Sequence, residues 1–245
     1  MSAPSIKWIS RDDPPEAFPG IDSALAAPNG LLAAGGDLSA DRLLYAYQHC
    51  IFPWFDSGQP ILWWSPDPRC VMIPQEFHVA RRLRRSLQKS ALVLTFNRAF
   101  GDVIAACGRR RQHVLPGTWI TPRMVDAYTE LHRLGWAHSV EAWLDDRLVG
   151  GVYGLAIGEV YFGESMFSHE TDASKIALLA LCRRIGQCGF RLLDCQVASP
   201  HLQSLGARLM RRNQFAAVIE KACAPGTRFR HWPADPVAAR RLLEE

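Results

Sequence analysis

The sequence has no apolar run long enough to cross a membrane. A membrane helix needs roughly 18 to 20 consecutive apolar residues, whereas the longest obvious apolar stretch, residues 176–182, is typical of one face of a core helix. The first residues lack the apolar segment of a secretion signal, and Asp12, Asp13 and Glu16 follow soon after. With 245 residues, 48% of them hydrophobic, the chain can form a globular core. We expect a cytoplasmic protein with no membrane partner.

The cysteine and histidine spacings of known metal sites are also missing. The seven cysteines are odd in number and include no CxxC pair, and none of the eight histidines belongs to an HExxH motif. We therefore expect reduced thiols, most of them in the core, and no bound metal. The cysteines are Cys50, Cys70, Cys107, Cys182, Cys188, Cys195 and Cys223.

The formal net charge of +4 is mild, but the basic residues are clustered. The clusters are Arg81, Arg82, Arg84, Arg85 and Lys89; Arg109, Arg110 and Arg111; and Arg208, Arg211 and Arg212. Any one of them is typical of a solvated face. Taken together with the tryptophans, the three clusters favour an anionic partner such as RNA.

Three of the eight tryptophans fall between residues 54 and 64. Prolines at positions 53, 60, 66 and 68 exclude a single regular helix, because each proline removes a backbone donor and fixes φ. The rings must therefore lie on turns or short edge strands. Two interpretations stay open: a core seam between two subdomains, and an aromatic platform for a nucleotide.

The N-terminal part reads as irregular, followed by a more regular C-terminal part. Glycines and prolines over residues 14–36 predict loops and short strands. Ser39 can begin a helix over residues 40–50. We place a boundary near residue 67, which gives a small mixed N-terminal domain (1–67) and a larger domain (68–245).

The larger domain reads as mixed helix and strand. Hydrophobic spacing predicts helices over 77–89, 100–107, 124–134 and 174–188, and strands over 92–96, 137–144, 147–157, 159–167 and 190–197. Thr121 and Pro122 are typical of a helix start. Helix, three-stranded meander, helix and strand form an α+β arrangement that resembles the core of the acetyl-CoA-dependent N-acetyltransferase fold. That fold binds the CoA pyrophosphate at a glycine-rich loop, whereas residues 168–174 have no glycine and carry two acids.

Two predicted strands end in polar side chains. Because side chains alternate along a strand, Asp194 and Gln196 should share one face and Cys195 the other. A carboxylate and an amide so placed can orient and deprotonate an amine, or can simply bond to neighbouring backbone. By the same alternation Glu164, Met166 and Ser168 should share one face of the preceding strand.

A carboxylate among apolar residues is costly unless it is paired or functional. Glu164 therefore either holds a cation or a ribose hydroxyl, or forms an internal ion pair with an arginine.

A set of motifs, taken in order, resembles the bacterial leucyl/phenylalanyl-tRNA–protein transferases over roughly residues 17–215. The motifs are Pro28-Asn29-Gly30-Leu31-Leu32-Ala33, Gly35-Gly36-Asp37-Leu38, Cys50-Ile51-Phe52-Pro53-Trp54-Phe55, Leu62-Trp63-Trp64-Ser65-Pro66-Asp67-Pro68-Arg69, Gly117-Thr118-Trp119-Ile120-Thr121, Gly163-Glu164-Ser165-Met166-Phe167-Ser168 and Asp194-Cys195-Gln196. The resemblance implies an acetyltransferase-like (GNAT-like) C-terminal domain that uses aminoacyl-tRNA in place of CoA. The implied aminoacyltransferase moves Leu, Phe or Met from tRNA to proteins beginning with Arg or Lys, which makes an N-degron, and needs no cofactor.

The same resemblance implies roles for individual residues. Asp194 and Gln196 would position and deprotonate the amine, either by direct base catalysis from Asp194 or with the ribose hydroxyl of the tRNA acting while Asp194 only orients. Tyr47, Trp54 and Trp119 would hold the terminal adenosine or frame the pocket, and Tyr128 would line the same region. Glu164 would fix either the ribose or the cationic end of the acceptor. Met166, Phe167, Leu179 and Leu193 would form the apolar pocket. Arg81, Arg82, Arg84, Arg85 and Lys89 would bind tRNA phosphates.

One stretch departs from the family pattern, the basic residues 109–114. Two other functions stay as alternatives: an acetyl-CoA-dependent N-acetyltransferase and a non-enzymatic RNA-binding module.

Overall fold

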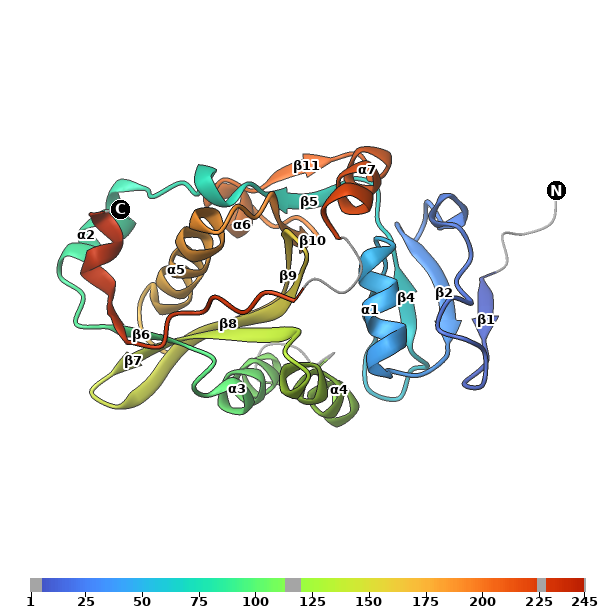
Figure 1. Cartoon of the computed structure of the whole chain (residues 1–245), viewed down its shortest axis with the longest axis horizontal. Helices are drawn as coiled ribbons and strands as arrows, with labels where there is room; N and C mark the ends of the chain where they lie inside the picture. The colour runs from blue at the N-terminus through green and yellow to red at the C-terminus, as the bar shows by residue number, and fades with distance from the viewer. Residues whose placement is uncertain (1–5, 113–119, 224–227, 245) are drawn as a thin grey trace.

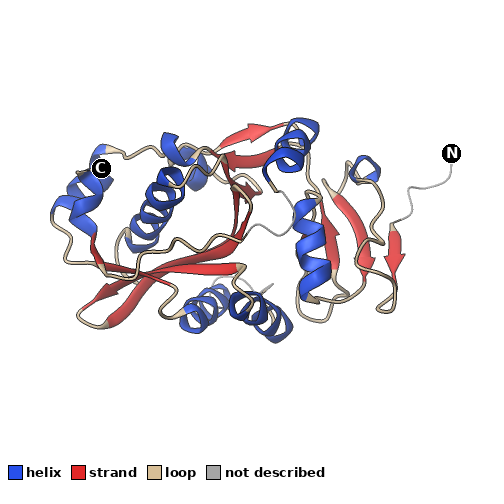
Figure 2. Ribbon diagram, viewed as in Figure 1, coloured by secondary structure: helices blue, strands red, loops and turns tan. Residues whose placement is uncertain are grey.

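The chain folds around two β-sheets that lie beside each other along its long axis (Figure 1). The computed structural model describes residues 6–112, 120–223 and 228–244, without the side chains of residues 110–112. Helices cover both faces of the larger sheet, and its mostly antiparallel pairing makes the fold α+β (Figure 2). Within the described ranges no helix is both long and apolar enough to cross a membrane.

The smaller sheet contains four strands from the N-terminal part of the chain. Their order is β1 (Lys7–Ile9), β2 (Leu31–Gly35), β4 (Leu62–Trp64) and β3 (Phe52–Pro53). A short helix, η1 (Ile21–Ser23), lies between β1 and β2. Helix α1 (Ala40–Gln48) begins at Ser39, whose hydroxyl accepts a hydrogen bond from the backbone N–H of Arg42. The helix predicted over 40–50 is therefore present, and the tryptophan run lies on β3, β4 and the turns beside them.

The larger sheet has the order β11-β5-β10-β9-β8-β7-β6-β12. Its strands are β5 (Arg69–Met72), β6 (Val93–Phe96), β7 (Ala137–Leu144), β8 (Arg147–Ile157), β9 (Val160–Ser168), β10 (Leu192–Gln196), β11 (Arg208–Met210) and β12 (Val237–Ala238). The predicted meander is confirmed as β7, β8 and β9. Asp145 and Asp146 have φ values of 47° and 61°, the positive values that a tight two-residue hairpin turn requires.

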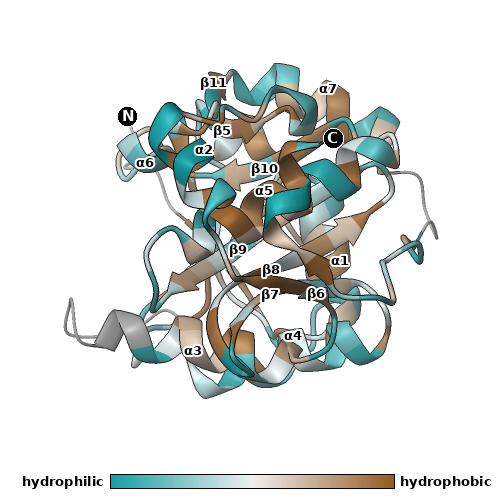
Figure 3. Cartoon of the chain, turned by 90° about the vertical axis from the view of Figure 1, so that its left-hand side faces the viewer, coloured by the Kyte–Doolittle hydropathy of each residue, from teal (hydrophilic) through white to brown (hydrophobic). Residues whose placement is uncertain are grey.

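Helices pack on both faces of the larger sheet. One face lies against α3 (Phe100–Gln112) and α4 (Pro122–Arg133), and this apolar cluster continues to α1 and α7 (Arg212–Ala222). The other face lies against α5 (Ala173–Gln187) and α2 (Arg81–Gln88), together with η2 (Pro74–Glu76), α6 (Pro200–Ser204) and η3 (Ala239–Leu243). Figure 3 shows apolar residues concentrated on the central strands, whereas α2 is largely hydrophilic.

Two predicted helix starts had different outcomes. Thr121 accepts a hydrogen bond from the backbone N–H of Met124 and is followed by Pro122, so the predicted start of α4 is confirmed. The prediction of a helix from residue 77 is wrong, because α2 begins at Arg81. Phe77 and Val79 pack against the core from the segment before it, which explains their apolar spacing.

The neighbouring strands β9 and β10 part from each other soon after they meet. Their parallel pairing covers only three residue pairs and ends where Asp194 lies opposite Phe162. Beyond that point β9 continues to Ser168, and the pairing of β10 with β5 becomes irregular between Asp194 and Gln196. A pocket opens where the two strands separate.

Candidate active site

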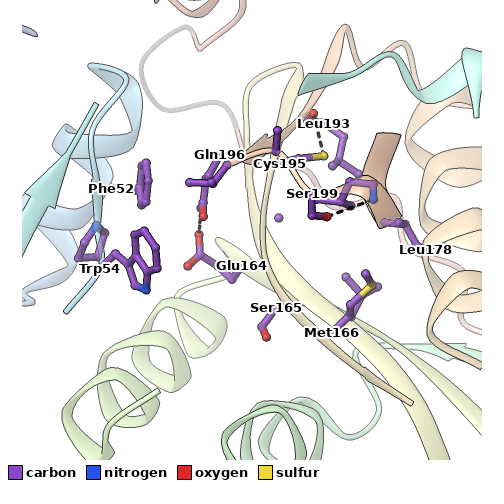
Figure 4. Close-up of a pocket in the computed structure, with 16 residues that line it drawn as sticks. Phe52, Trp54, Glu164, Ser165, Met166, Leu178, Leu193, Cys195, Gln196 and Ser199 are labelled. Atoms are coloured by element: carbon purple, nitrogen blue, oxygen red, sulfur yellow. Dashed lines mark hydrogen bonds between the residues drawn. The ribbon is translucent and has the colours of Figure 1, made fainter. Parts of the chain in front are cut away.

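The pocket between the ends of β9 and β10 has a volume of about 410 Å³ (Figure 4). Its polar half presents Glu164 and Gln196 beside Phe52 and Trp54. Its apolar half is lined by Val152, Met166, Leu178, Leu193, Cys195 and Leu202. One cavity therefore combines a hydrophobic wall with a carboxyl group and an amide.

The carboxyl group of Glu164 is buried, and groups from three other elements bond to it. Tyr47 of α1 donates to Oε1 at 2.7 Å, and Tyr128 of α4 donates to Oε2 at 3.0 Å. The side-chain amide of Gln196 donates to Oε1 at 2.8 Å. The phenol oxygens of Tyr47 and Tyr128 also contact one another.

This network fits a carboxyl group that is neutral for part of the time. Two phenols bring only two protons to the three contacts that join Tyr47, Tyr128 and Glu164. A neutral carboxyl group supplies the third proton, since it has one O–H donor and still accepts on its other oxygen. Burial raises the pKa of Glu164 to about 7, although the hydrogen bonds from Tyr47, Tyr128 and Gln196 act to lower it. Near neutral pH Glu164 can therefore take up or release a proton.

Glu164 lies on a bulge of β9, which changes the direction of its side chain. The register between β8 and β9 shifts at this point, so Glu164 is the extra residue. It faces α1 and α4, whereas Met166 packs toward α5 and Ser168 accepts a hydrogen bond from the backbone N–H of Ser174, outside the pocket. The prediction that Glu164, Met166 and Ser168 share one face is wrong, because strict alternation holds only for a strand without a bulge.

Asp194 forms a buried, doubly hydrogen-bonded ion pair with Arg69 of β5. The bonds from Arg69 Nε to Asp194 Oδ1 and from Arg69 Nη2 to Asp194 Oδ2 measure 2.9 and 2.7 Å, and the side chains are 1% and 0% exposed. Arg69 also donates to the carbonyl oxygen of Cys50 at 3.1 Å, and its guanidinium lies over the rings of Phe52 and Phe215. Burial disfavours the charged guanidinium and is the largest single effect on its pKa, but the charge and hydrogen bonds of Asp194, with smaller contributions from Cys50 and Tyr47, together raise the pKa of Arg69. The paired geometry fixes the orientation of the carboxylate.

Gln196 links this ion pair to the pocket wall. Its φ of 62° is a left-handed conformation, which is unfavourable for a residue with a side chain. The backbone N–H of Gln196 donates to Asp194 Oδ1 at 2.9 Å, while its side chain reaches Glu164. Gln196 lines the pocket and Asp194 lies behind it. Cys195 packs toward the opposite face, as alternation predicted.

The tryptophan run divides between the pocket and the core. Trp54 is 41% exposed and borders the pocket, and its carbonyl oxygen accepts a hydrogen bond from the indole of Trp64 at 2.6 Å. Trp63 is completely buried and donates to the carbonyl oxygen of Gly35. Both interpretations of the tryptophan run therefore have a structural counterpart. The exposed ring of Trp54 at the pocket corresponds to the aromatic platform, and the buried ring of Trp63 corresponds to the core contact. Tyr47, by contrast, has no exposed ring face on which a base could stack.

The apolar half contains only some of the residues expected there. Met166 and Leu193 line the pocket, whereas Phe167 and Leu179 are core residues away from it. Leu178, the neighbour of Leu179 on α5, lines the pocket instead. The helical spacing identifies α5 as amphipathic but does not say which of its buried residues reaches the cavity.

The basic residues predicted to bind tRNA lie on the outer face of α2. Leu83 and Leu87 are buried, while Arg81, Arg82, Arg84, Arg85 and Lys89 are exposed. Part of this face borders a second cavity of about 430 Å³, opposite Glu170 and Asp172.

Two features of the sequence lie outside the described part of the chain. The first is Trp119. The second is the basic stretch 109–114, in which the structure describes only one side chain, that of Arg109. Among the residues that are described, no group of three or more His, Cys, Asp or Glu could hold a metal ion.

Sequence reasoning did not find the role of Arg69. This residue ends the motif Leu62 to Arg69, but only the pairing of β5 with β10 brings it to Asp194. The two residues are 125 positions apart, so no local spacing reports their contact.

Two family models match the chain, in order and without overlap. One, described as leucyl/phenylalanyl-tRNA protein transferase, matches residues 71–220, and the other, described as its N-terminal domain, matches residues 36–67. The chain belongs to the leucyl/phenylalanyl-tRNA–protein transferase family. The matched ranges include Trp54, Glu164, Asp194 and Gln196.

Curated members of this transferase family resemble the chain over most of their length. The leucyl/phenylalanyl-tRNA–protein transferases of Stutzerimonas stutzeri, Pseudomonas fluorescens and Azotobacter vinelandii are 52%, 53% and 56% identical to it. The alignments cover 87%, 88% and 82% of this chain and 93%, 94% and 88% of those proteins. A solved structure of a conserved protein from Bacteroides thetaiotaomicron is similar at a TM-score of 0.41 and 9% identity, over 66% of this chain and 56% of that one. That likeness is too weak to support an argument about the fold.

Proposed function

We propose that this family member moves leucine, phenylalanine or methionine from the 3′ end of its tRNA to the α-amine of a protein that begins with arginine or lysine. The names of its relatives supply the aminoacyl-tRNA donor. The supporting observation is that one pocket joins an apolar wall for the transferred side chain to a carboxyl group for a cationic acceptor. An aminoacyl ester is already activated, so the protein has to supply positioning rather than ATP or a cofactor.

The product would carry a new N-terminal residue that marks it for degradation. We place the reaction in the cytoplasm, where charged tRNA is available. The seven cysteines are free thiols, which fits a reducing compartment.

We further propose that the larger sheet and its helices form an acetyltransferase-like domain, preceded by a small domain that ends near residue 67. The order α4, β7, β8, β9, α5, β10 supports the fold, and the change from β4 to β5 between Trp64 and Arg69 supports the boundary. The start of α5 argues against CoA as the donor. Asp172 precedes the helix and pairs with Lys175 at 2.7 Å, so a pyrophosphate would meet a carboxylate there.

Trp54 is the proposed platform for the terminal adenosine of the tRNA, together with Trp119. The hydrogen bond from Trp64 to the backbone of Trp54 fixes the base of this platform, and the exposed ring stands at the mouth of the pocket. An adenine stacked there places the attached amino acid beside the apolar half. The shape of that half would favour unbranched or γ-branched side chains over isoleucine and valine.

Gln196 is the group proposed to orient the attacking amine. Its side-chain N–H donates to Glu164, so its carbonyl oxygen is the atom that can accept a hydrogen bond from the amine. Glu164, when ionised, would attract the cationic side chain of the acceptor. Of the two mechanisms open from the sequence, the geometry supports the one in which Asp194 orients, because Arg69 and the backbone of Gln196 occupy its oxygens behind the pocket wall. The neighbouring ribose hydroxyl of the tRNA would then accept the proton of the amine and give its own proton to the ester oxygen, which leaves as the C–O bond breaks and the new amide bond forms.

The exposed basic face of α2 is proposed to bind acceptor-stem phosphates without reading sequence. Phosphate contacts of this kind fix the register of the RNA and leave recognition of the amino acid to the pocket.

The deciding experiment incubates the purified protein with labelled leucyl-tRNA and with peptides that begin with Arg, Lys or Ala. We expect label on the Arg and Lys peptides only, and none when free leucine and ATP replace the charged tRNA. Transfer from acetyl-CoA would support an N-acetyltransferase instead. Binding of tRNA without transfer to any peptide would support an RNA-binding module.

A further inference from the structure

The two parts of the chain carry net charges of opposite sign. Residues 1–67 contain eight acidic and three basic side chains, a net charge of −5, so residues 68–245 carry a net charge of +9. One of the three bases, Arg42, is buried against Asp37 and two backbone carbonyl groups. The surface of the N-terminal part is therefore acidic, and its field repels RNA phosphates and attracts cationic polypeptide.

A groove of about 770 Å³ lies where α1 meets α7, next to the junction of the two sheets (Figure 1). Its floor is apolar and includes Phe18, Ile51 and Ile219. One wall is a stack of rings, in which His49 lies on Tyr45 with 3.8 Å between the ring centroids. The groove is larger than the active-site pocket of about 410 Å³, so it has room for more than one side chain.

The carboxylates that line this groove have no partner of their own. Asp22 lies on η1 and Glu220 on α7, and both side chains are exposed. Neither forms an ion pair or a side-chain hydrogen bond with the rest of the described chain, and no described lysine or arginine lines the groove. An apolar floor beside two unpaired carboxylates is complementary to lysine and arginine side chains, because their aliphatic stems pack on apolar surface while the charged ends stay in water.

The groove adjoins the active site along one short segment of the chain. Cys50 and Ile51 line the groove, whereas Phe52 and Trp54 line the active-site pocket. Three extended residues span about 10 Å. An acceptor whose first residue lies beside Glu164 therefore needs only a few more residues to reach the groove.

We propose that this groove docks a basic segment of the acceptor protein, located a few residues after its N-terminus. The identity of the occupant rests on the proposed function, whereas binding of a basic peptide does not. Aliphatic stems of lysine or arginine pack on the apolar floor, and the charged ends pair with Asp22 and Glu220. The tRNA and the acceptor then approach surfaces of opposite charge, and acceptors that share an N-terminal arginine differ in affinity according to the basic residues that follow it.

The first measurement is binding of a fluorescent, N-acetylated, lysine-rich peptide, which has no free α-amine and cannot be a substrate. Asp22→Asn/Glu220→Gln should weaken its binding by about three- to tenfold, the effect of two exposed ion pairs. Ala217→Lys places a cation at an exposed position of the groove and should weaken binding at least as much. The control Asp12→Asn/Asp41→Asn removes two exposed acids outside the groove and should change binding by less than about twofold, because salt screens distant charges.

The second measurement is transfer of leucine to two peptides that both begin with arginine. One peptide has two lysines after its first residues, and the other has alanines in their place. The groove variant Asp22→Asn/Glu220→Gln should raise KM for the lysine peptide by about three- to tenfold at unchanged kcat. KM for the alanine peptide and KM for aminoacyl-tRNA should stay the same.

Equal binding of the acetylated peptide by the wild type and both groove variants overturns the docking site. An equally large loss in the control variant would assign the attraction to the net charge of the N-terminal part and overturn docking in the groove. A wild-type dimer in sedimentation that both groove variants lose would assign the groove to a second copy of the chain instead. Weaker binding with an unchanged KM for the lysine peptide overturns the role in acceptor recognition. If the wild type transfers nothing to any peptide, the proposed function fails, while the acetylated peptide still decides whether the groove binds a basic segment.

Discussion

Replacing Glu164 by Gln should remove a specific pH dependence of stability. The pKa of Glu164 is raised from 4.5 to about 7 by burial, and each pKa unit corresponds to about 1.4 kcal/mol, so its ionisation destabilises the folded state by about 3 kcal/mol. Below pH 4.5 the group is protonated in both states and carries no such cost. Between pH 4.5 and 7 the unfolded chain releases the proton while the folded protein keeps it, so the free energy of unfolding falls as pH rises.

The assay is urea unfolding of wild type and Glu164→Gln at several pH values from 4.5 to 8. The difference between the two proteins should change by about 3 kcal/mol across this range, with the variant relatively more stable at high pH. Glutamine keeps the size of the side chain and can bond to both tyrosines, so the variant should fold. Parallel pH profiles for the two proteins would refute the account of the Glu164 network.

The same titration should appear in acceptor binding if ionised Glu164 attracts the acceptor. The ionised fraction of a group with a pKa of about 7 rises roughly tenfold between pH 6 and 8, so KM for an Arg-peptide should fall about tenfold in wild type relative to Glu164→Gln. Glu141→Gln is a matched control, because Glu141 is also buried with a raised pKa but bonds to Thr95 and Ser139 away from the pocket. This control should alter the pH dependence of stability and leave that of KM unchanged.

Four further variants test the other assigned groups. Asp194→Ala should slow transfer at least ~10²-fold and should destabilise the fold by about 3 to 5 kcal/mol, because it leaves Arg69 buried without its partner. The double variant Arg69→Met/Asp194→Leu should regain stability in urea unfolding but should not regain the transfer rate. Normal transfer by the double variant would refute the orienting role of Asp194. Trp54→Ala should raise KM for aminoacyl-tRNA by about 10- to 100-fold, the loss of one stacking contact, with little change in thermal stability; an unchanged KM would exclude stacking. The double variant Arg81→Gln/Arg85→Gln should weaken tRNA binding and should reduce the slope of log affinity against log salt concentration by about 1.5. Filter binding measures this slope, and an unchanged slope would show that α2 does not contact the tRNA.

Elements set by local sequence signals were predictable. The turn at Asp145 and Asp146 and the capped start of α4 at Thr121 depend on residues within a few positions, and the structure has both. The start of α2 could not be predicted from local signals, because Phe77 and Val79 pack against the core from the segment before the helix rather than from the helix itself.

The candidate site was predictable in composition more than in geometry. Motif order identified Trp54, Glu164 and Gln196, and these three line one pocket. The bulge at Glu164 depends on how β9 pairs with β8, and the partner of Asp194 comes from a strand far away in sequence. Neither the bulge at Glu164 nor the partner of Asp194 can be read from a short window of neighbouring residues. Periodicity alone therefore assigned Glu164 to the wrong face of its strand and suggested no partner for Asp194.

The guanidinium of Arg69 limits how the site can move. It joins the carbonyl of Cys50, the rings of Phe52 and Phe215, and the carboxylate of Asp194. These groups come from three segments besides β5, and sliding β10 past β5 would separate a buried charge from its partner, at a cost of several kcal/mol. We therefore expect the rear of the pocket to move as one unit during turnover. Adjustment to different amino acids and acceptors must occur at its exposed front, beside Trp54.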